Sequence, residues 1–251
     1  MKSKPLAGLN IVVTRPREQA SYLAQEIARL GGHAILFPLL KIEPTLDTPE
    51  LHGIITRLPQ FDLAIFISLN AVRFGLQAIG TVPSSLQLAA VGQGTARALN
   101  IASVQTVIAP QSQFDSEALL ALPELQTVQN KKIVIFRGDG GRELLGDTLK
   151  ARGAIVEYAA CYRRSKPVMN LDTLLRQPLD ALTISSSEAL RNLAEIPNFE
   201  SLCALPLFVP HPRIAAAAQK SGWQNIIHTA SGDDELLSSL VAWSQHNRSL
   251  N

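Results

Sequence analysis

The sequence predicts an α/β protein with parallel sheets whose second half repeats its first half. Short apolar strands alternate with amphipathic helical segments, and similar segments recur at constant offsets along the chain. An alternation of strands and helices favours a parallel sheet that is covered by helices on both faces. Hydrophobic residues form 46% of the 251 residues and charged residues 18%, so the chain can bury a core and is not expected to be disordered.

The first elements show the alternation most clearly. Residues 10–13 form an apolar run that predicts a strand, and residues 18–30 predict a helix because apolar side chains recur at i, i+4 and i+7. The pair Gly31 and Gly32 ends this helix, and residues 34–37 predict the next strand.

The later segments repeat the earlier ones. Residues 180–191 resemble residues 62–73 with matching Asp, Ser, Ala and Arg, and residues 133–137 resemble residues 11–15. The chain therefore divides into four pieces that we name A (10–44), B (61–122), A′ (132–167) and B′ (180–243). A and A′ each end in a polar stretch with a proline, which predicts a linker and not a buried strand. The residues leave open whether A packs with B or with B′, and a cleft between the two halves is the expected working surface.

The turn after residue 136 carries the strongest candidate binding site. Arg137, Gly138, Gly141 and Arg142 lie between a predicted strand and a predicted helix. Turn amides, helix N-termini and arginines bind anions, and the carboxyl ends of parallel strands are where such sheets bind ligands. The alternative is a tight turn with solvated arginines.

Weaker candidates occupy the other predicted strand-to-helix turns, where helix capping uses the same residue types. They are Thr14, Arg15, Ser68, Asn70, Gly92, Gly94, Thr95, Ser185, Ser186, Ser187, His211 and Arg213. The turn at residues 92–97 does not match the dinucleotide fingerprint because Arg97 stands where a third Gly or Ala is required. The alternative to anion binding there is a glycine turn in which Thr95 caps the following helix. His211 lies between two prolines and is expected to be exposed.

Several classes of function are not supported by the sequence. The net charge of +2 gives no argument for nucleic-acid binding. Cys161 and Cys203 lack metal-ligand spacing and fit a reducing cytosol, and no metal site is expected. There is no phosphate loop or nucleophile elbow. No signal peptide or membrane span is predicted, so the expected location is cytoplasmic.

Taken together, these segments resemble the uroporphyrinogen-III synthase family over nearly the whole chain. The most specific parts are residues 137–145, 151–154 and 162–164, and the other matching segments are 10–16, 67–72, 90–96 and 184–187. Each motif is weak alone, and their order and spacing carry the resemblance.

The resemblance implies two flavodoxin-like domains with parallel sheets, joined by a two-stranded β ladder. It pairs A with B′ and B with A′. Domain 1 would comprise residues 1–39 and 167–251 and domain 2 residues 47–157, with 40–46 and 158–166 as linker strands.

The resemblance also implies a cyclising lyase without a cofactor. Members of the family dehydrate hydroxymethylbilane, a linear tetrapyrrole with eight carboxylates, and close it to uroporphyrinogen III with inversion of the last pyrrole ring. Tyr162 matches the linker tyrosine that is proposed as general acid, although a tyrosine there could also serve packing. A monomer is expected, with transient contact to the upstream enzyme allowed and no nucleic-acid or membrane partner.

One turn departs from the family pattern. Many relatives carry a small hydroxyl residue near His211 or Ile214, so a hydroxyl role there is in doubt, while a backbone or Arg213 contact to a substrate carboxylate remains open. The main alternative function is a non-catalytic, two-lobed cytosolic binding protein for an acidic ligand. A nucleotide-dependent enzyme ranks third because both phosphate fingerprints are missing.

Overall fold

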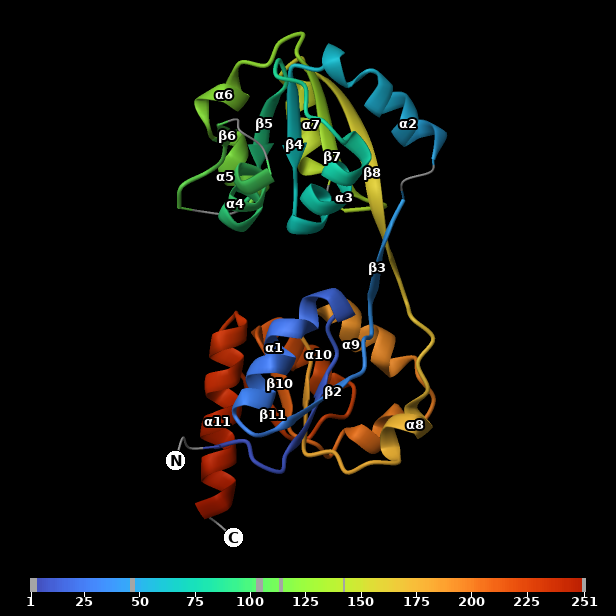
Figure 1. Ribbon diagram of the computed structural model, residues 1–251, viewed down its shortest axis with the longest axis vertical. Coiled ribbons are helices and arrows are strands. Elements are labelled where there is room, and N and C mark those ends of the chain that lie inside the picture. The colour runs from blue at the N-terminus through green and yellow to red at the C-terminus, as the bar shows by residue number, and fades with distance from the viewer. Residues whose placement is uncertain (1–3, 46–47, 103–105, 113–114, 142, 250–251) are drawn as a thin grey trace. The chain divides into compact units, whose positions relative to one another are not determined.

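The computed structural model describes residues 4–45, 48–102, 106–112, 115–141 and 143–249. The chain divides by its contacts into two compact units. Unit 1 comprises Met1–Lys41 and Ser165–Asn251, and unit 2 comprises Ile42–Arg164. Each unit has its own sheet and its own helices (Figure 1). None of the helices in the described ranges is long and apolar enough to cross a membrane.

Unit 1 is built on a five-stranded sheet with the strand order β11-β10-β9-β1-β2. Its elements are β1 (Asn10–Val13), α1 (Arg17–Arg29), β2 (His33–Leu36), α8 (Leu171–Leu175), β9 (Ala181–Thr183), α9 (Ser187–Ala194), the 3₁₀ helix η2 (Phe199–Leu202), β10 (Leu207–Val209), α10 (Pro212–Lys220), β11 (Ile226–His228) and α11 (Asp233–Ser249). All four strand pairings are parallel. If the five strands of this sheet are numbered 1 to 5 along the chain, their order from β2 to β11 is 2-1-3-4-5. This is the flavodoxin-like order.

Unit 2 contains a six-stranded sheet with the order β3-β8-β7-β4-β5-β6. Its elements are β3 (Lys41–Pro44), α2 (Pro49–Thr56), the 3₁₀ helix η1 (Leu58–Gln60), β4 (Leu63–Phe66), α3 (Leu69–Ile79), β5 (Gln87–Ala90), α4 (Gln93–Ala102), β6 (Val107–Ile108), α5 (Ser116–Leu120), α6 (Pro123–Gln126), β7 (Lys132–Gly138), α7 (Leu144–Ala151) and β8 (Ile155–Ser165). β3 enters from the unit 1 segment and lies beside β8.

The two sheets repeat one another strand by strand. β2, β1, β9, β10 and β11 of unit 1 take the places of β8, β7, β4, β5 and β6 of unit 2. The register agrees as well, because Val13 pairs with Thr183 and the matching Ile135 pairs with Ile65. Unit 1 therefore combines pieces A and B′, and unit 2 combines B and A′, as the resemblance implied.

Side chains on successive positions of the central strands pack into separate cores on the two faces of each sheet. In β7, Val134 and Phe136 enter one core, while Ile133 and Ile135 enter the other. This alternation follows from the two-residue period of a strand. Both faces of a parallel sheet are covered, so the strands read as continuous apolar runs in the sequence.

The sequence prediction for the end of piece A′ was wrong in one respect. That stretch was expected to be a linker and not a buried strand, but β8 runs through it to Ser165. Ala159, Cys161 and Tyr162 are buried in the core of unit 2. The equivalent stretch in piece A, β3, is exposed or half-buried along its length.

Candidate functional site

The predicted site residues gather at the carboxyl edges of the two sheets. In unit 2 the turns after β4, β5 and β7 share one edge because these strands are adjacent and parallel. This edge carries Ser68, Asn70, Gly92, Gly94, Thr95, Arg137, Gly138 and Gly141. The matching edge of unit 1 carries Thr14, Arg15, Ser185, Ser186, Ser187, His211 and Arg213. Arg142 lies outside the described residues.

Several of these side chains cap helices or brace the sheet. The Ser68 and Ser186 hydroxyls each accept a hydrogen bond from the backbone N–H three residues later, at 3.1 and 3.0 Å. Nδ1 of His211, an exposed residue as expected, accepts the Arg213 N–H at 3.1 Å. The buried Thr14 hydroxyl donates to the Thr183 carbonyl at 2.7 Å. These four side chains therefore have structural partners at the edge.

The capping interpretation of Thr95 was wrong. α4 begins at Gln93, so Thr95 is its third residue and lies buried inside the first turn. Gly94 is also inside this turn, and a Cβ placed on it would meet no atom within 4 Å. The absence of a side chain at Gly94 is therefore not required by its neighbours among the described residues.

Arg137 is the most constrained polar side chain at the unit 2 edge. Only 7% of the side chain is exposed, and its Nη1 donates to Oε1 of Glu143 at 2.9 Å. Its Cζ lies 4.8 Å from the centroid of the Tyr158 ring. Gly141 has φ +132°, and a Cβ there would lie 3.1 Å from Nη2 of Arg137. The alternative of a solvated arginine therefore does not hold for Arg137.

The charges around Arg137 are set by its two partners. The Tyr158 phenol and the Arg137 guanidinium lower the pKa of the Glu143 carboxyl group. Burial, followed by the Glu143 carboxylate, raises the pKa of Tyr158 to about 12. At neutral pH the group therefore comprises a charged arginine, a charged glutamate and a neutral phenol.

Sequence reasoning did not identify Glu143 or Tyr158. Glu143 directly precedes α7, where an acidic residue is ordinarily explained by the helix dipole. Tyr158 comes from β8 and is paired with Ile135, which lies two residues before Arg137 on the same face of β7. This shared face is the signal that could have connected the tyrosine to the arginine.

A cavity of about 190 Å³ adjoins Arg137, and we call it the Arg137 cavity. Its walls come from the unit 2 edge and the elements beside it. They are formed by Ile67, Val91, Ser116, Ile135, Arg137, Leu145 and Tyr158. The cavity thus combines five aliphatic or aromatic surfaces with a guanidinium and a serine hydroxyl.

Unit 1 has a counterpart, which we call the Arg15 pocket. Arg15 occupies the position in piece A that Arg137 occupies in A′, and it forms an ion pair with Asp233 at the start of α11. The pocket offers only about 10 Å³. It is lined by Arg15, Thr183, Ile184, Ser185, Phe208, Pro210, Thr229, Gly232 and Leu236.

Tyr162 lies in the core of unit 2. Its side chain is buried, and its ring centroid is 6.0 Å from that of Phe74. A Cβ on Gly138 would lie 2.8 Å from the Tyr162 ring, so the tyrosine requires a glycine there. The phenolic oxygen is 3.2 Å from Oγ of the half-buried Ser68, which connects Tyr162 to the edge.

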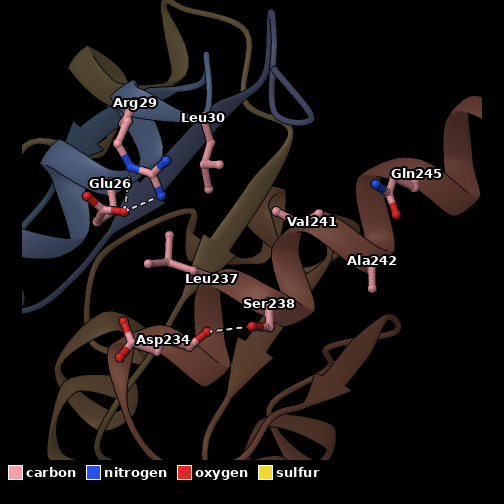
Figure 2. A pocket seen from close by; sticks show the side chains of 9 residues that line it. All are labelled: Glu26, Arg29, Leu30, Asp234, Leu237, Ser238, Val241, Ala242 and Gln245. Atoms are coloured by element: carbon pink, nitrogen blue, oxygen red, sulfur yellow. Dashed lines mark hydrogen bonds and ion pairs between the residues drawn. The ribbon is translucent and has the colours of Figure 1, made fainter. Parts of the chain in front are cut away.

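A larger hollow lies away from the predicted residues, between α1 and α11 of unit 1 (Figure 2). It measures about 480 Å³. Glu26, Arg29 and Leu30 line one side, and Glu26 accepts hydrogen bonds from Arg29 at 2.6 and 2.8 Å. The other wall is α11, with Leu237 and Val241 among its residues. None of the predicted site residues lines this hollow.

The described parts of the chain contain no candidate metal site and no reactive thiol. No group of three or more His, Cys, Asp or Glu residues there is placed to hold a metal ion. Cys161 and Cys203 are free and buried. Burial raises the pKa of Cys161 to about 12, so this thiol is not a nucleophile at neutral pH.

Comparison with known sequences gives one consistent result. A family model described as uroporphyrinogen-III synthase HemD matches residues 21–237. The chain is 34% identical to the uroporphyrinogen-III synthase of Escherichia coli over 244 residues, which cover 91% of this chain and 98% of that protein. It is 30% identical to the uroporphyrinogen-III synthase of Synechococcus elongatus over 207 residues, covering 78% of this chain and 77% of that protein.

Solved structures share the fold. A crystal structure of a mutant uroporphyrinogen III synthase from Thermus thermophilus superimposes with a TM-score of 0.61 at 19% identity, over 96% of this chain and 100% of that one. The enzyme named uroporphyrinogen-III synthetase from Helicobacter pylori gives 0.59 at 14% identity, over 94% and 99%. These likenesses support the α/β architecture described above.

Proposed function

This chain belongs to the uroporphyrinogen-III synthase family, and we propose that it acts as a cyclising lyase on hydroxymethylbilane without a cofactor. In this reaction the hydroxymethyl C–O bond breaks, water leaves, and the freed carbon bonds to the substituted α-carbon of the last pyrrole ring. The bond from that ring carbon to the neighbouring bridge carbon then breaks, and the bridge carbon bonds to the unsubstituted α-carbon of the same ring. That carbon loses its proton, and the ring is left inverted. The observation that carries the proposal is the repetition of one polar carboxyl edge in two units, each with an arginine held by an acid.

Two polar edges suit a substrate with eight carboxylates, because such a ligand needs donors spread over a large area. Arg137, Arg213 and the turn amides near Gly138 and Gly141 are candidates at these edges. The buried Ser187 hydroxyl, at the start of α9, has no hydrogen-bond partner among the described residues and can donate to a ligand. We propose that each unit binds part of the substrate at its own edge.

Positioning is the main catalytic contribution that these residues offer. The open chain can close without inversion, so the protein must hold the last ring with its substituted carbon toward the departing hydroxyl. Holding two reacting groups in such a geometry contributes about 7–11 kcal/mol in favourable cases. The fixed donors at both edges would supply this constraint without any reactive metal or nucleophile.

Tyr162 is the proposed general acid, and Ser68 is the group through which it acts. The buried phenol lies against the Ser68 hydroxyl, which is nearer the surface. In this scheme the Ser68 proton passes to the departing hydroxyl while the Tyr162 proton passes to Ser68. The proton released when the macrocycle forms returns to the phenolate.

The experiment that tests the function is product analysis. Purified protein is given hydroxymethylbilane, and the products are oxidised to uroporphyrins and separated into isomers I and III. We expect isomer III to form faster than isomer I forms spontaneously. Isomer I alone, at the spontaneous rate, would overturn the proposal, and tetrapyrrole binding without turnover would favour the non-catalytic binding protein.

The acid role has its own test. Tyr162→Phe keeps the ring that Phe74 and Gly138 contact, so the fold should persist. We expect kcat to fall roughly 100-fold with KM nearly unchanged, which is the lower end of what general acids contribute. An unchanged kcat would make Tyr162 a packing residue.

The remaining expectations concern location and assembly. We propose a cytoplasmic monomer, supported by the two buried free thiols, with transient contact to the enzyme that supplies hydroxymethylbilane. We also propose residues 1–39 with 167–251 and residues 47–157 as the two domains, with 40–46 and 158–166 as the strands that join them. Ala159, Cys161 and Tyr162 of the second strand also pack in the core of unit 2.

A further inference from the structure

The Arg137 cavity has a shape and lining that suit one particular part of the substrate. We propose that it is the subsite for a single carboxylate side arm of the tetrapyrrole, in which Arg137 pairs with the carboxylate while Glu143 and Tyr158 act as positioning residues. This inference rests on the proposed function and adds to it the cavity, its occupant and the two positioning residues.

The size of the cavity limits what can enter. Pockets for whole small molecules measure about 300–1,000 Å³, whereas this one offers about 190 Å³. A pyrrole macrocycle is too large, but an acetate or propionate arm fits with room for water beside it.

The lining matches the two ends of such an arm. Ile67, Val91 and Leu145 offer aliphatic surface to methylene groups. Arg137 and the Ser116 hydroxyl offer donors to a carboxylate. A short apolar chain that ends in a negative charge is therefore complementary to both parts of the wall.

The guanidinium is held in place before any ligand arrives. Nη1 is bonded to Glu143, Nη2 lies beside Gly141, and the Tyr158 ring is stacked near Cζ. Ordering a long side chain in advance removes an entropic cost of roughly 0.5–1.5 kcal/mol from binding. The carboxylate arm would therefore bind to an Arg137 side chain whose rotamer is already fixed.

The existing ion pair leaves capacity for a second carboxylate. A guanidinium has five N–H donors. Within the described residues, the side chain of Arg137 donates one hydrogen bond, from Nη1 to Glu143. The Glu143 side chain is 54% exposed and is not among the residues that line the cavity. Glu143 thus compensates the buried charge in the free protein without occupying the subsite.

Filling the cavity tests the occupant directly. Val91 is half-buried at the cavity wall, and Val91→Phe replaces free volume with a ring and leaves all charges in place. Affinity for uroporphyrin III is measured by the change in porphyrin fluorescence, with thermal unfolding as a check of the fold. We expect at least tenfold weaker binding for Val91→Phe and for Arg137→Gln. Ile155→Phe, an exposed residue at the start of β8, is the matched control and should bind like the wild type.

The double variant separates a shared subsite from two independent effects. If the arm pairs with Arg137 inside the cavity, Val91→Phe with Arg137→Gln should bind no more weakly than the weaker of the two single variants. Additive losses, or a folded Val91→Phe that binds normally, would overturn the inference. Inorganic phosphate and propionate serve as competitors, and competition by phosphate alone would replace the carboxylate arm with a phosphate ligand.

The positioning residues need a readout that a purely structural role would not change. Glu143→Gln and Tyr158→Leu should raise KM while kcat stays nearly constant, and Tyr158→Phe should restore KM because the ring under Arg137 returns. Equal KM for Tyr158→Leu and Tyr158→Phe would remove Tyr158 from the proposal. Because porphyrin binding is measured without turnover, failure of the proposed function appears in the isomer assay and failure of the subsite in the binding assay.

Discussion

Arg15 of unit 1 and Arg137 of unit 2 occupy matching positions of the repeat, and each is paired with an acid at the start of a helix. The acids have different origins, because Asp233 comes from piece B′ whereas Glu143 comes from A′ itself. The space beside the arginines also differs, at about 10 Å³ in unit 1 and about 190 Å³ in unit 2. The duplication has therefore kept the charged pair and changed what surrounds it.

The walls explain part of this difference. In the Arg15 pocket, Phe208 and Leu236 are buried side chains that line the space. In the Arg137 cavity the large ring, Tyr158, lies under the guanidinium. The Arg15 side chain is 20% exposed and borders little free volume, whereas the Arg137 side chain is 7% exposed and borders the larger cavity. We therefore expect Arg15 mainly to brace its unit and Arg137 also to bind a ligand. The following predictions test this contrast.

The largest expected effect separates the two arginines. Arg137→Gln should weaken uroporphyrin III binding roughly 10- to 100-fold, because a hydrogen bond to a charged group contributes about 1.5–3 kcal/mol. Arg15→Gln should lower the midpoint of thermal unfolding and weaken binding by a smaller factor, because it leaves Asp233 without its partner. Fluorescence titration of both variants is the measurement, and equal losses of affinity would contradict the contrast.

A pair of helical glycines gives a smaller effect. A Cβ on Gly146 would overlap the Tyr158 hydroxyl, so Gly146→Ala must displace the ring that supports Arg137. We expect a loss of about 1–3 kcal/mol in unfolding free energy, together with weaker binding. Gly53→Ala in α2 meets no atom within 4 Å and should gain about 0.5–1 kcal/mol. Urea unfolding compares the two, and similar values would show that Tyr158 is free to move.

The smallest effect concerns pH. The pKa of Glu143 is lowered in the folded protein, so the stability that it contributes is present above its usual pKa and is lost as the pH falls through the lowered value. Tyr158 has a raised pKa of about 12, so its contribution is present below pH 10 and is lost between about pH 10 and 12. Glu143→Gln should therefore be less stable than the wild type at pH 7, and the difference should shrink as the pH falls through the lowered pKa of Glu143. A difference that persists in acid would exclude the ion pair as its cause.

Much of the architecture could be predicted from local patterns and the repeat. The central strands of both sheets are continuous apolar runs in the sequence. The matching register of β1 and β7 follows from the similarity of residues 11–15 and 133–137. The pairing of A with B′ could not be derived from these patterns, because each piece has the same apolar faces. It came from the family resemblance.

The site was predictable only where its parts are close in the sequence. Arg137, Gly138 and Gly141 belong to one turn and were found together, whereas Tyr158 reaches Arg137 from the neighbouring strand. The sequence left open whether Tyr162 faces a cleft or packs, and its burial depends on β8 continuing the sheet through a stretch with polar neighbours. The volume of the Arg137 cavity depends on side chains from six separate segments, and no local pattern determines it.

The central claim is that the arginine of unit 2 receives a substrate carboxylate while its counterpart in unit 1 serves mainly to hold its own unit. Arginine side-chain NMR tests it most directly, with the Nε–H signals of Arg137 and Arg15 assigned through Arg137→Gln and Arg15→Gln. On titration with uroporphyrin III, we predict a large shift of the Arg137 signal and a small one for Arg15. A bound protein in which the Arg137 signal does not move would contradict the account.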